Sequence, residues 1–303
     1  VDVLLATLEK KLYDNIFIPG HTTNLTKDEV LTTLSEIRQI LIHQHNGLFQ
    51  QSVEQLMNRV QLFGLHFASL DIRQDNSVHG KVLAAIAARQ GNTGFDFLPD
   101  YQPDAENRAT DEMVNETLNV MKTIQSIQQS NGKEGCHRYI ISQCTSALNV
   151  MEVYQLLILS GWKSEELNID IVPLFETVDD LQGASAVMQQ LYNHPVYKHH
   201  LQRRGNQQTI MLGFSDGTKD GGYLMANWSI YKAKEELTAI SRQFGIDVVF
   251  FDGRGGPPAR GGGKTHRFYA SMGKNIANKE IQLTVQGQTV SSNFGTQDAA
   301  QFN

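Results

Sequence analysis

The chain has 303 residues, of which 40% are hydrophobic and 19% are charged, a balance typical of globular proteins with a sizeable core. Its net charge of −6 at pH 7 argues against binding nucleic acid through charge alone. It has no apolar run of about 18 residues, no leader-like N-terminus, and only two cysteines, Cys136 and Cys144. These features exclude membrane-spanning, disulfide-rich and disordered classes. They predict a cytoplasmic globular protein with neither a membrane nor a nucleic acid as its partner.

The first part of the chain is predicted to be helical. Thr26 and Glu29 have the spacing of a capping box, and apolar residues then recur at helical spacing from Val30 to Leu41. A second helical stretch runs over about 48–62. We therefore expect residues 1–62 to form a mainly helical lead-in.

Strands alternate with helices in the rest of the chain, residues 63–303. A first strand is expected over 65–72, followed by a loop rich in Gly, Pro, Asp and Asn at about 91–110 and a helix at 111–130. Further strands are expected at 138–143, 169–175, 209–214, 247–251 and 281–285, and helical patterns follow the first four of these at 147–160, 180–192, 224–244 and 266–273. Continuous apolar runs in these strands are typical of a parallel sheet that is covered on both faces.

A parallel series of this kind can form an open doubly wound sheet or a closed barrel. Polar residues follow the apolar part of the strands at Arg73, Gln143, Glu176, Asp216 and Asp252. In a barrel all of these positions meet at one face, whereas an open sheet brings only two or three together. The pattern favours a barrel. Six strand candidates make that barrel incomplete, since a closed one has eight.

The segment 253–264 is the most informative motif. Its glycines let the backbone approach an anion closely, and Arg254 and Arg260 add forked donors suited to phosphate or carboxylate oxygens. It matches neither the Walker loop nor the dinucleotide fingerprint, because Pro258 stands where each needs a glycine. A flexible linker is the alternative. The arginines within the glycines favour an anion-binding loop.

Two carboxylates, Glu176 and Asp216, follow neighbouring strands and are candidates for binding a divalent cation. Mg²⁺ takes one or two protein carboxylates and completes its shell with water and substrate oxygens. Each carboxylate alone could instead cap a helix. Lys219, just past Asp216, and Arg73 are candidates for binding anions, although an arginine at a strand end also commonly pairs with an acid.

Taken together, these segments resemble the signature blocks of the phosphoenolpyruvate carboxylase family over nearly the whole chain. The matching blocks are residues 63–74, 139–142, 172–180, 211–220 and 253–263. The family's Thr-Ala-His-Pro-Thr-Glu motif and its downstream arginine-rich segment are not in this sequence. The resemblance thus implies that residues 1–303 form a single domain, the central part of a longer enzyme. Its fold would be α/β, an incomplete (β/α)8 TIM-type barrel with additional helices.

The resemblance implies that the longer enzyme is a cytoplasmic lyase, a homotetramer that carboxylates phosphoenolpyruvate with bicarbonate to give oxaloacetate and phosphate. It implies a Mg²⁺ or Mn²⁺ cofactor, no biotin, and no activity for the chain alone. The implied metal ligands are Glu176 and Asp216. The implied catalytic residues are Arg73, Lys219, Asp252, Arg254 and Arg260. The implied substrate-binding residues are Arg73, Arg254, Gly255, Gly256 and Arg260.

One departure from the family stands out at Asp252, where the family's loop usually begins with a histidine. A carboxylate cannot donate a hydrogen bond to an anion at pH 7. A non-catalytic or phosphoenolpyruvate-hydrolysing relative is therefore the alternative function. We expect Asp252 to pair with a nearby cation, with Arg254 the first candidate, and we expect Asp252→His to retain or improve carboxylation.

Overall fold

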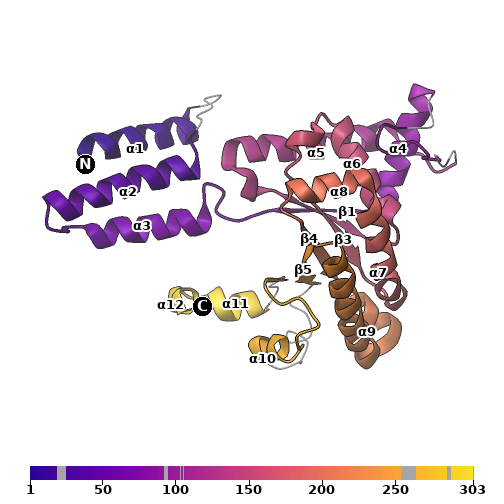
Figure 1. Cartoon of the computed structure of the whole chain (residues 1–303). Helices are drawn as coiled ribbons and strands as arrows, with labels where there is room; N and C mark the ends of the chain where they lie inside the picture. The colour runs from indigo at the N-terminus through magenta and orange to yellow at the C-terminus, as the bar shows by residue number, and fades with distance from the viewer. Residues whose placement is uncertain are drawn as a thin grey trace. The chain divides into compact units, whose positions relative to one another are not determined.

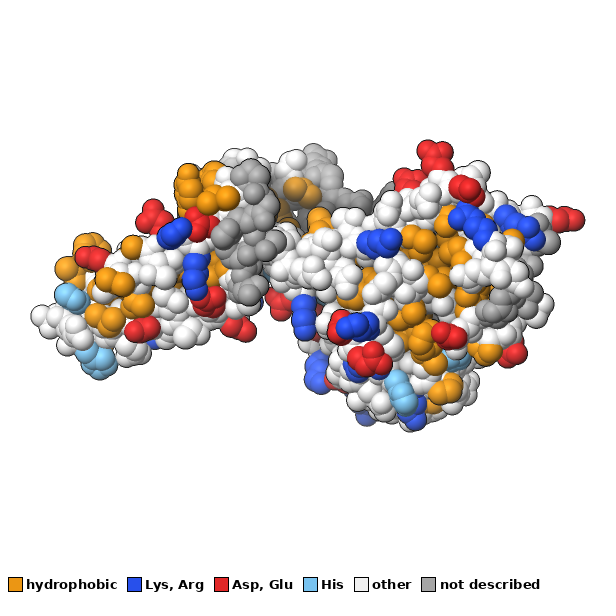
Figure 2. Space-filling view, turned by 90° about the horizontal axis from the view of Figure 1, so that it is seen from above, with side chains coloured by type: hydrophobic (Ala, Val, Ile, Leu, Met, Phe, Trp, Pro, Cys, Tyr) orange, Lys and Arg blue, Asp and Glu red, His pale blue; other side chains and the backbone are white. Residues whose placement is uncertain are grey.

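The computed structural model describes residues 1–18, 25–91, 95–102, 104, 106–253, 264–284 and 288–302. It contains two compact units (Figure 1). The helical unit comprises residues 1–71 and 120–137, and the barrel unit comprises residues 72–119 and 138–303. Within the described ranges, no helix is long and apolar enough to cross a membrane. On the face shown in Figure 2, acidic and basic side chains are interspersed on both units, and the described residues form no continuous basic band there.

The helical unit is built from α1 (Asp2–Phe17), α2 (Lys27–Gln44), α3 (Gln50–Phe63), the second half of α5 (Asp111–Asn131) and the short η1 (Lys133–Gly135). The predicted start of α2 is confirmed, because the Thr26 side chain accepts a hydrogen bond from the Glu29 N–H at 3.1 Å. One face of α2 supplies most of the buried cluster in the N-terminal part of this unit: Val30, Leu34, Ile37 and Leu41 are all buried. The helical spacing read from the sequence is thus the spacing of the buried face.

The barrel unit is built on six strands, β1 (Asp71–Asp75), β2 (Arg138–Ser142), β3 (Asp170–Phe175), β4 (Gln207–Leu212), β5 (Asp247–Asp252) and β6 (Ile281–Leu283). Their order in the sheet is the order in the chain, and the pairings from β2 to β6 are parallel. A doubly wound sheet would reverse its order at a switch point. The unbroken order confirms the α/β fold with an incomplete barrel.

The helices of this unit are α4 (Asn76–Gln90), α6 (Ala147–Leu159), α7 (Val178–Asn193), α8 (Pro195–Arg203), α9 (Ser215–Gln243), α10 (Thr265–Ala270), α11 (Gln288–Phe294) and α12 (Gln297–Phe302), with η2 (Ser164–Glu166). Helices α6 and α7 pack against β3, α8 packs against β4 and α9 packs against β5 (Figure 1). The inner face of the sheet is filled by Ile140, Val172, Leu174, Met211 and Phe251, which form one buried cluster. Strands covered in this way need the continuous apolar runs seen in the sequence.

The first strand differs from its prediction. Of the apolar residues that suggested a strand over 65–72, Phe67 and Leu70 lie in irregular chain, where Phe67 is 76% exposed; β1 begins only at Asp71 and includes Ile72. Arg73 therefore lies within β1 and not after it. The helix expected over 224–244 is found as the part of α9 that follows a kink at Gly222, where the backbone is not helical (φ 78°, ψ 171°). A short stretch of helix that begins at Ser215 precedes this kink and carries Asp216 and Lys219.

Candidate active site at the carboxyl ends of the strands

The carboxyl ends of four neighbouring strands lie level with one another. Phe175 pairs with Leu212, Leu212 pairs with Asp252, and Asp252 pairs with Leu283. The residues that follow these positions border a pocket of about 240 Å³. Its lining is Arg73, Leu174, Glu176, Met211, Gly213, Phe214, Ser215, Asp216, Lys219, Gly253 and Thr284. The pocket thus brings together Arg73, Glu176, Asp216 and Lys219, four of the polar residues that the sequence pointed to.

Glu176 is held in a fixed position at the end of β3. The backbone N–H of Gln143 donates a hydrogen bond to its Oε2 at 2.9 Å. Gly213 leaves room for it, because a Cβ at position 213 would come within 3.1 Å of the Glu176 Cα. Burial raises the pKa of Glu176, the Gln143 N–H and Arg73 lower it, and the negative charge of Asp216 raises it further.

Asp216 lies in the first turn of α9 and pairs with Lys219 at 2.8 Å, with both side chains exposed to solvent. The charge of Asp216 acts on Glu176 across the pocket, as expected for two carboxylates that face the same space. The described ranges hold no group of three or more His, Cys, Asp or Glu side chains that could enclose a metal ion. The half-buried Glu176 and the exposed Asp216 fit Mg²⁺, which keeps several waters and substrate oxygens in its shell.

Arg73 supplies positive charge to the other side of the pocket. Its guanidinium lies 3.2 Å from the Met211 sulfur, and its charge lowers the pKa of Glu176. Sulfur is a weak acceptor, so this contact leaves most of the guanidinium donors for other partners.

Most of the glycine-rich segment falls outside the described residues. Arg254, Gly255, Gly256 and Arg260, all of which the sequence singled out, lie there. Gly253 is described and lines the pocket, and a Cβ at this position would lie 3.2 Å from the Leu212 carbonyl oxygen. The close approach of two backbones therefore explains the first glycine of the segment.

The side chain of Asp252 is not among the described residues that line the pocket. It is buried, with 2% of its surface exposed, and its Oδ2 accepts a hydrogen bond from the Lys234 ammonium at 2.7 Å. The Tyr269 hydroxyl donates to the same oxygen, and burial together with the Asp252 charge raises the pKa of Tyr269. The cation expected beside Asp252 is thus present. It is Lys234 of α9, whereas Arg254 is outside the described residues.

Sequence reasoning missed Lys234 and Tyr269. Both are distant from Asp252 along the chain, and neither belongs to a motif. One signal was available, because Lys234 lies within the apolar stripe of α9 that includes Ile230 and Leu237. A lysine in a buried stripe requires a carboxylate partner, since an unpaired buried charge is costly.

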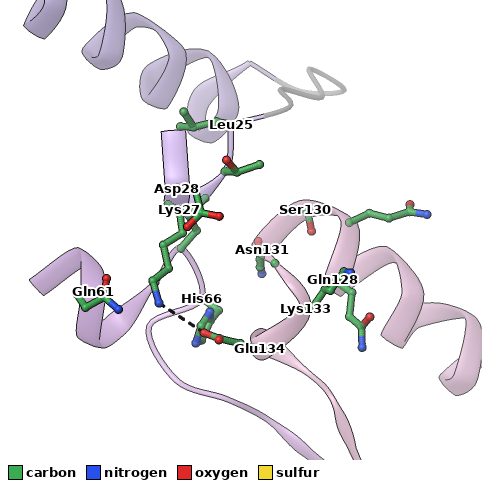
Figure 3. A pocket seen from close by; sticks show the side chains of 15 residues that line it. Leu25, Lys27, Asp28, Gln61, His66, Gln128, Ser130, Asn131, Lys133 and Glu134 are labelled. Carbon is green, nitrogen blue, oxygen red and sulfur yellow. Dashed lines mark ion pairs between the residues drawn. The ribbon is translucent and has the colours of Figure 1, made fainter. Parts of the chain in front are cut away.

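A larger pocket, of about 470 Å³, lies in the helical unit (Figure 3). Its lining mixes amide side chains such as Gln61 and Asn131 with Lys27, which lies 3.7 Å from Glu134. None of the buried polar atoms that lack a partner in the described structure belongs to its lining. The smaller pocket at the strand ends remains the candidate site, because the residues singled out in the sequence meet there.

Comparisons with known proteins agree with the resemblance seen in the sequence. A family model described as phosphoenolpyruvate carboxylase matches residues 6–303. A phosphoenolpyruvate carboxylase of Nitrosomonas eutropha is 33% identical over 278 residues, and one of Nitrosomonas europaea is 32% identical over 278 residues. Each alignment covers 85% of this chain and 30% of the relative, so the chain spans less than a third of the length of these proteins.

The crystal structure of an HpcH/HpaI aldolase from Desulfitobacterium hafniense was also matched. It is 13% identical, with a TM-score of 0.35, and the match covers 77% of this chain and 92% of the aldolase chain. The α/β fold with an incomplete barrel is assigned from the order and direction of the strands, and not from this likeness.

Proposed function

Because this chain belongs to the phosphoenolpyruvate carboxylase family, we propose that it is the central part of an enzyme that joins phosphoenolpyruvate to bicarbonate and releases oxaloacetate and phosphate. The observation that carries the proposal is the pocket at the strand ends. There two carboxylates, Glu176 and Asp216, share a small space with two cationic side chains, Arg73 and Lys219.

This combination of charges suits the reaction. Phosphoenolpyruvate and bicarbonate are both anions, so the main barrier to bringing them together is electrostatic repulsion. Arg73 would bind oxygens of the phosphate or carboxylate through its free donors, and Lys219 would lend positive charge at the rim. Preorganised donors of this kind are each typically worth about 10²–10³ in rate.

Glu176 and Asp216 would hold Mg²⁺ or Mn²⁺. When bound, the ion supplies positive charge to substrate oxygens. The chain's part is to hold the ligands ready, which the Gln143 N–H does for Glu176 and Lys219 does for Asp216. The negative charge of Asp216 raises the pKa of Glu176, and a cation placed between the two carboxylates would relieve that repulsion.

The remaining roles follow from the family alone. Arg254 and Arg260, with the backbone of Gly255 and Gly256, would complete the set of anion donors, and no biotin would take part. The enzyme would be a homotetramer. The chain alone would not carboxylate, because the histidine motif that the family carries is outside these residues.

The test is a steady-state assay of the complete protein for oxaloacetate and phosphate, with Mg²⁺ varied. We expect Glu176→Gln to lower kcat by at least about 100-fold and to raise the Mg²⁺ concentration needed for half-maximal rate. Glu165→Gln, an exposed change of the same kind on η2, is the matched control and should behave as wild type. A wild-type protein that forms no oxaloacetate at any metal concentration would overturn the proposal.

A second candidate is hydrolysis of phosphoenolpyruvate without carboxylation, and the observation that favours it is Asp252 in place of the family's histidine. The same assay separates the two. Phosphate formed in excess of oxaloacetate identifies the hydrolase, and equal amounts identify the carboxylase.

A further inference from the structure

Lys234, Asp252 and Tyr269, here called the Lys234 cluster, join three elements directly behind the pocket: α9, β5 and α10. We propose that Lys234 and Tyr269 are positioning residues that hold the Asp252 carboxylate out of the pocket and thereby fix the end of β5 at its rim. In this proposal the buried Lys234 ammonium also requires a carboxylate at position 252. Its catalytic consequence rests on the function proposed above.

The cluster is closed to water and balanced in charge. The Lys234 and Asp252 side chains are 1% and 2% exposed, and their ion pair is 2.7 Å long. The Lys234 ammonium also lies 5.4 Å from the ring centroid of Phe250 and 5.4 Å from that of Tyr269. Aromatic faces at this distance attract a cation. One carboxylate and two rings thus surround the ammonium group, and the Tyr269 hydroxyl binds the same carboxylate oxygen from its own side.

The backbone of Asp252 links this cluster to the pocket. Its carbonyl oxygen accepts the Thr284 N–H at 3.3 Å, and the next residue along the chain is Gly253. Both Gly253 and Thr284 line the pocket. A shift of Asp252 would therefore move two walls of the pocket at once, although its side chain touches neither substrate nor metal in this arrangement.

The cluster explains how a carboxylate is tolerated where the family usually has a histidine. At the pocket an unpaired carboxylate would repel anionic substrates, and in the cluster its charge is neutralised by Lys234. It follows that the histidine cannot simply be restored. Asp252→His would leave the buried ammonium without its counter-ion, and removing one partner of a buried pair is strongly destabilising. This reverses the expectation, drawn from the sequence alone, that Asp252→His retains or improves carboxylation.

The kinetic experiment compares Lys234→Met, Asp252→His and the double variant Lys234→Met/Asp252→His in the complete protein. We expect each single change to lower kcat at least 10-fold, with a smaller change in KM for phosphoenolpyruvate. The double variant should recover kcat at least 10-fold over Asp252→His, because it removes the unpaired cation. Lys232→Met, a partly exposed lysine on the same helix that pairs with Glu235, is the matched control. An Asp252→His protein with wild-type kcat, or a double variant no better than it, would overturn the inference.

Hydrogen–deuterium exchange on the same proteins gives a readout that does not depend on activity. We expect faster exchange at residues 247–253 and 281–284 in Lys234→Met, unchanged exchange at 138–142, and wild-type exchange throughout in Lys232→Met. Unchanged exchange at 281–284 would contradict the positioning role. If Lys234→Met does not fold, it is replaced by Lys234→Met/Asp252→Asn, which removes both charges. Faster exchange at residues 247–253 and 281–284 is again expected, and unchanged exchange at 281–284 again contradicts the positioning role. A wild-type protein without carboxylase activity would overturn the proposed function, and the exchange data would still decide this inference.

Discussion

Glu152, on α6, is a buried carboxylic acid outside the candidate site. Its side chain is 5% exposed and accepts a long hydrogen bond from Asn149 at 3.4 Å. Burial raises the pKa of Glu152 to about 7, and the Asn149 bond opposes this only partly. Between pH 4.5 and 7 the folded chain therefore binds a proton that the unfolded chain has lost, so stability falls as the pH rises through this window.

Glu152→Gln should remove this loss. At pH 8 we expect a higher free energy of unfolding than in wild type, by an amount of the order of 3 kcal/mol at most, and at pH 4.5 we expect little difference. Urea unfolding at the two pH values measures it. Glu165→Gln, at an exposed position, is the control. Equal effects of Glu152→Gln at pH 4.5 and pH 8 would show that the carboxyl group does not titrate abnormally.

His200 has the opposite pH dependence. The basic segment around it suggests an exposed side chain, yet it is 1% exposed and contacts the rings of Tyr154 and Tyr197. Burial, and then the charges of Arg203 and Arg204, lower its pKa to about 4. The unfolded chain therefore binds more protons between pH 6.5 and 4, and stability falls as the pH falls through that range.

His200→Phe should flatten this acid limb. The phenyl ring keeps the aromatic contacts and carries no proton, so we expect the stability of the variant to depend less on pH between 6.5 and 4. Thermal unfolding over this range compares it with wild type and with His199→Gln, a change at an exposed neighbour. A variant that loses as much stability as wild type on acidification would rule out His200 as a source of the effect.

At the scale of the elements, the sequence predicted five of the six strands closely, because strands covered on both faces leave long apolar runs. It misplaced β1, whose residues are largely polar, and it missed α4. The segment of α4 from Val82 to Ala87 is buried all round, so it shows no amphipathic period. Glu176 and Asp216 of the candidate site were predictable because they follow strands, whereas Arg73 lies within β1. The Lys234 cluster was not, because only the packing of α9 on β5 brings its members together.

Gly213 tests the close packing at the end of β4, and Gly183 on α7 serves as its control. Gly213→Ala would place a Cβ 3.1–3.2 Å from atoms of Glu176 and displace that carboxylate, whereas Gly183, exposed on α7, has nothing within 4 Å. We expect Gly213→Ala to weaken Mn²⁺ binding in the presence of phosphoenolpyruvate at least 10-fold. Gly183→Ala should leave binding unchanged and raise stability by about 0.5–1 kcal/mol. Isothermal titration calorimetry and urea unfolding measure the two effects, and equal Mn²⁺ affinity in both variants would contradict the prediction.

At the scale of the whole molecule, the barrel unit is an open arc. Within the described residues, β1 and β6 each pair on one side only. Apolar side chains are also exposed on the first half of α9, including Leu224 at 82% and Trp228 at 59%. Unpaired strand edges and exposed apolar patches both favour association with another chain.

We therefore expect the purified 303-residue chain to self-associate. Sedimentation velocity over a range of micromolar concentrations should show a weight-average mass that rises with concentration. Leu224→Ser/Trp228→Ser should reduce this rise, because it removes two of the exposed apolar side chains of α9. Leu5→Ser in α1, an exposed apolar change in the helical unit, is the comparison. A wild-type chain that sediments as a single monomeric species at the highest concentration would contradict the prediction.

The order of the strands has a consequence for how the protein is made. Every pairing from β2 to β6 joins strands that are neighbours in the chain, as when Arg138 pairs with Asp170 and Gln207 pairs with Asp247. Each of these pairings closes a stretch of about 30–40 residues, and the entropic cost of closing a loop rises with the length of the loop. During translation each strand leaves the ribosome to meet the edge of the strand synthesised just before it. The sheet can therefore grow from its N-terminal edge at the pace of synthesis, one strand and helix at a time, without waiting for the end of the chain.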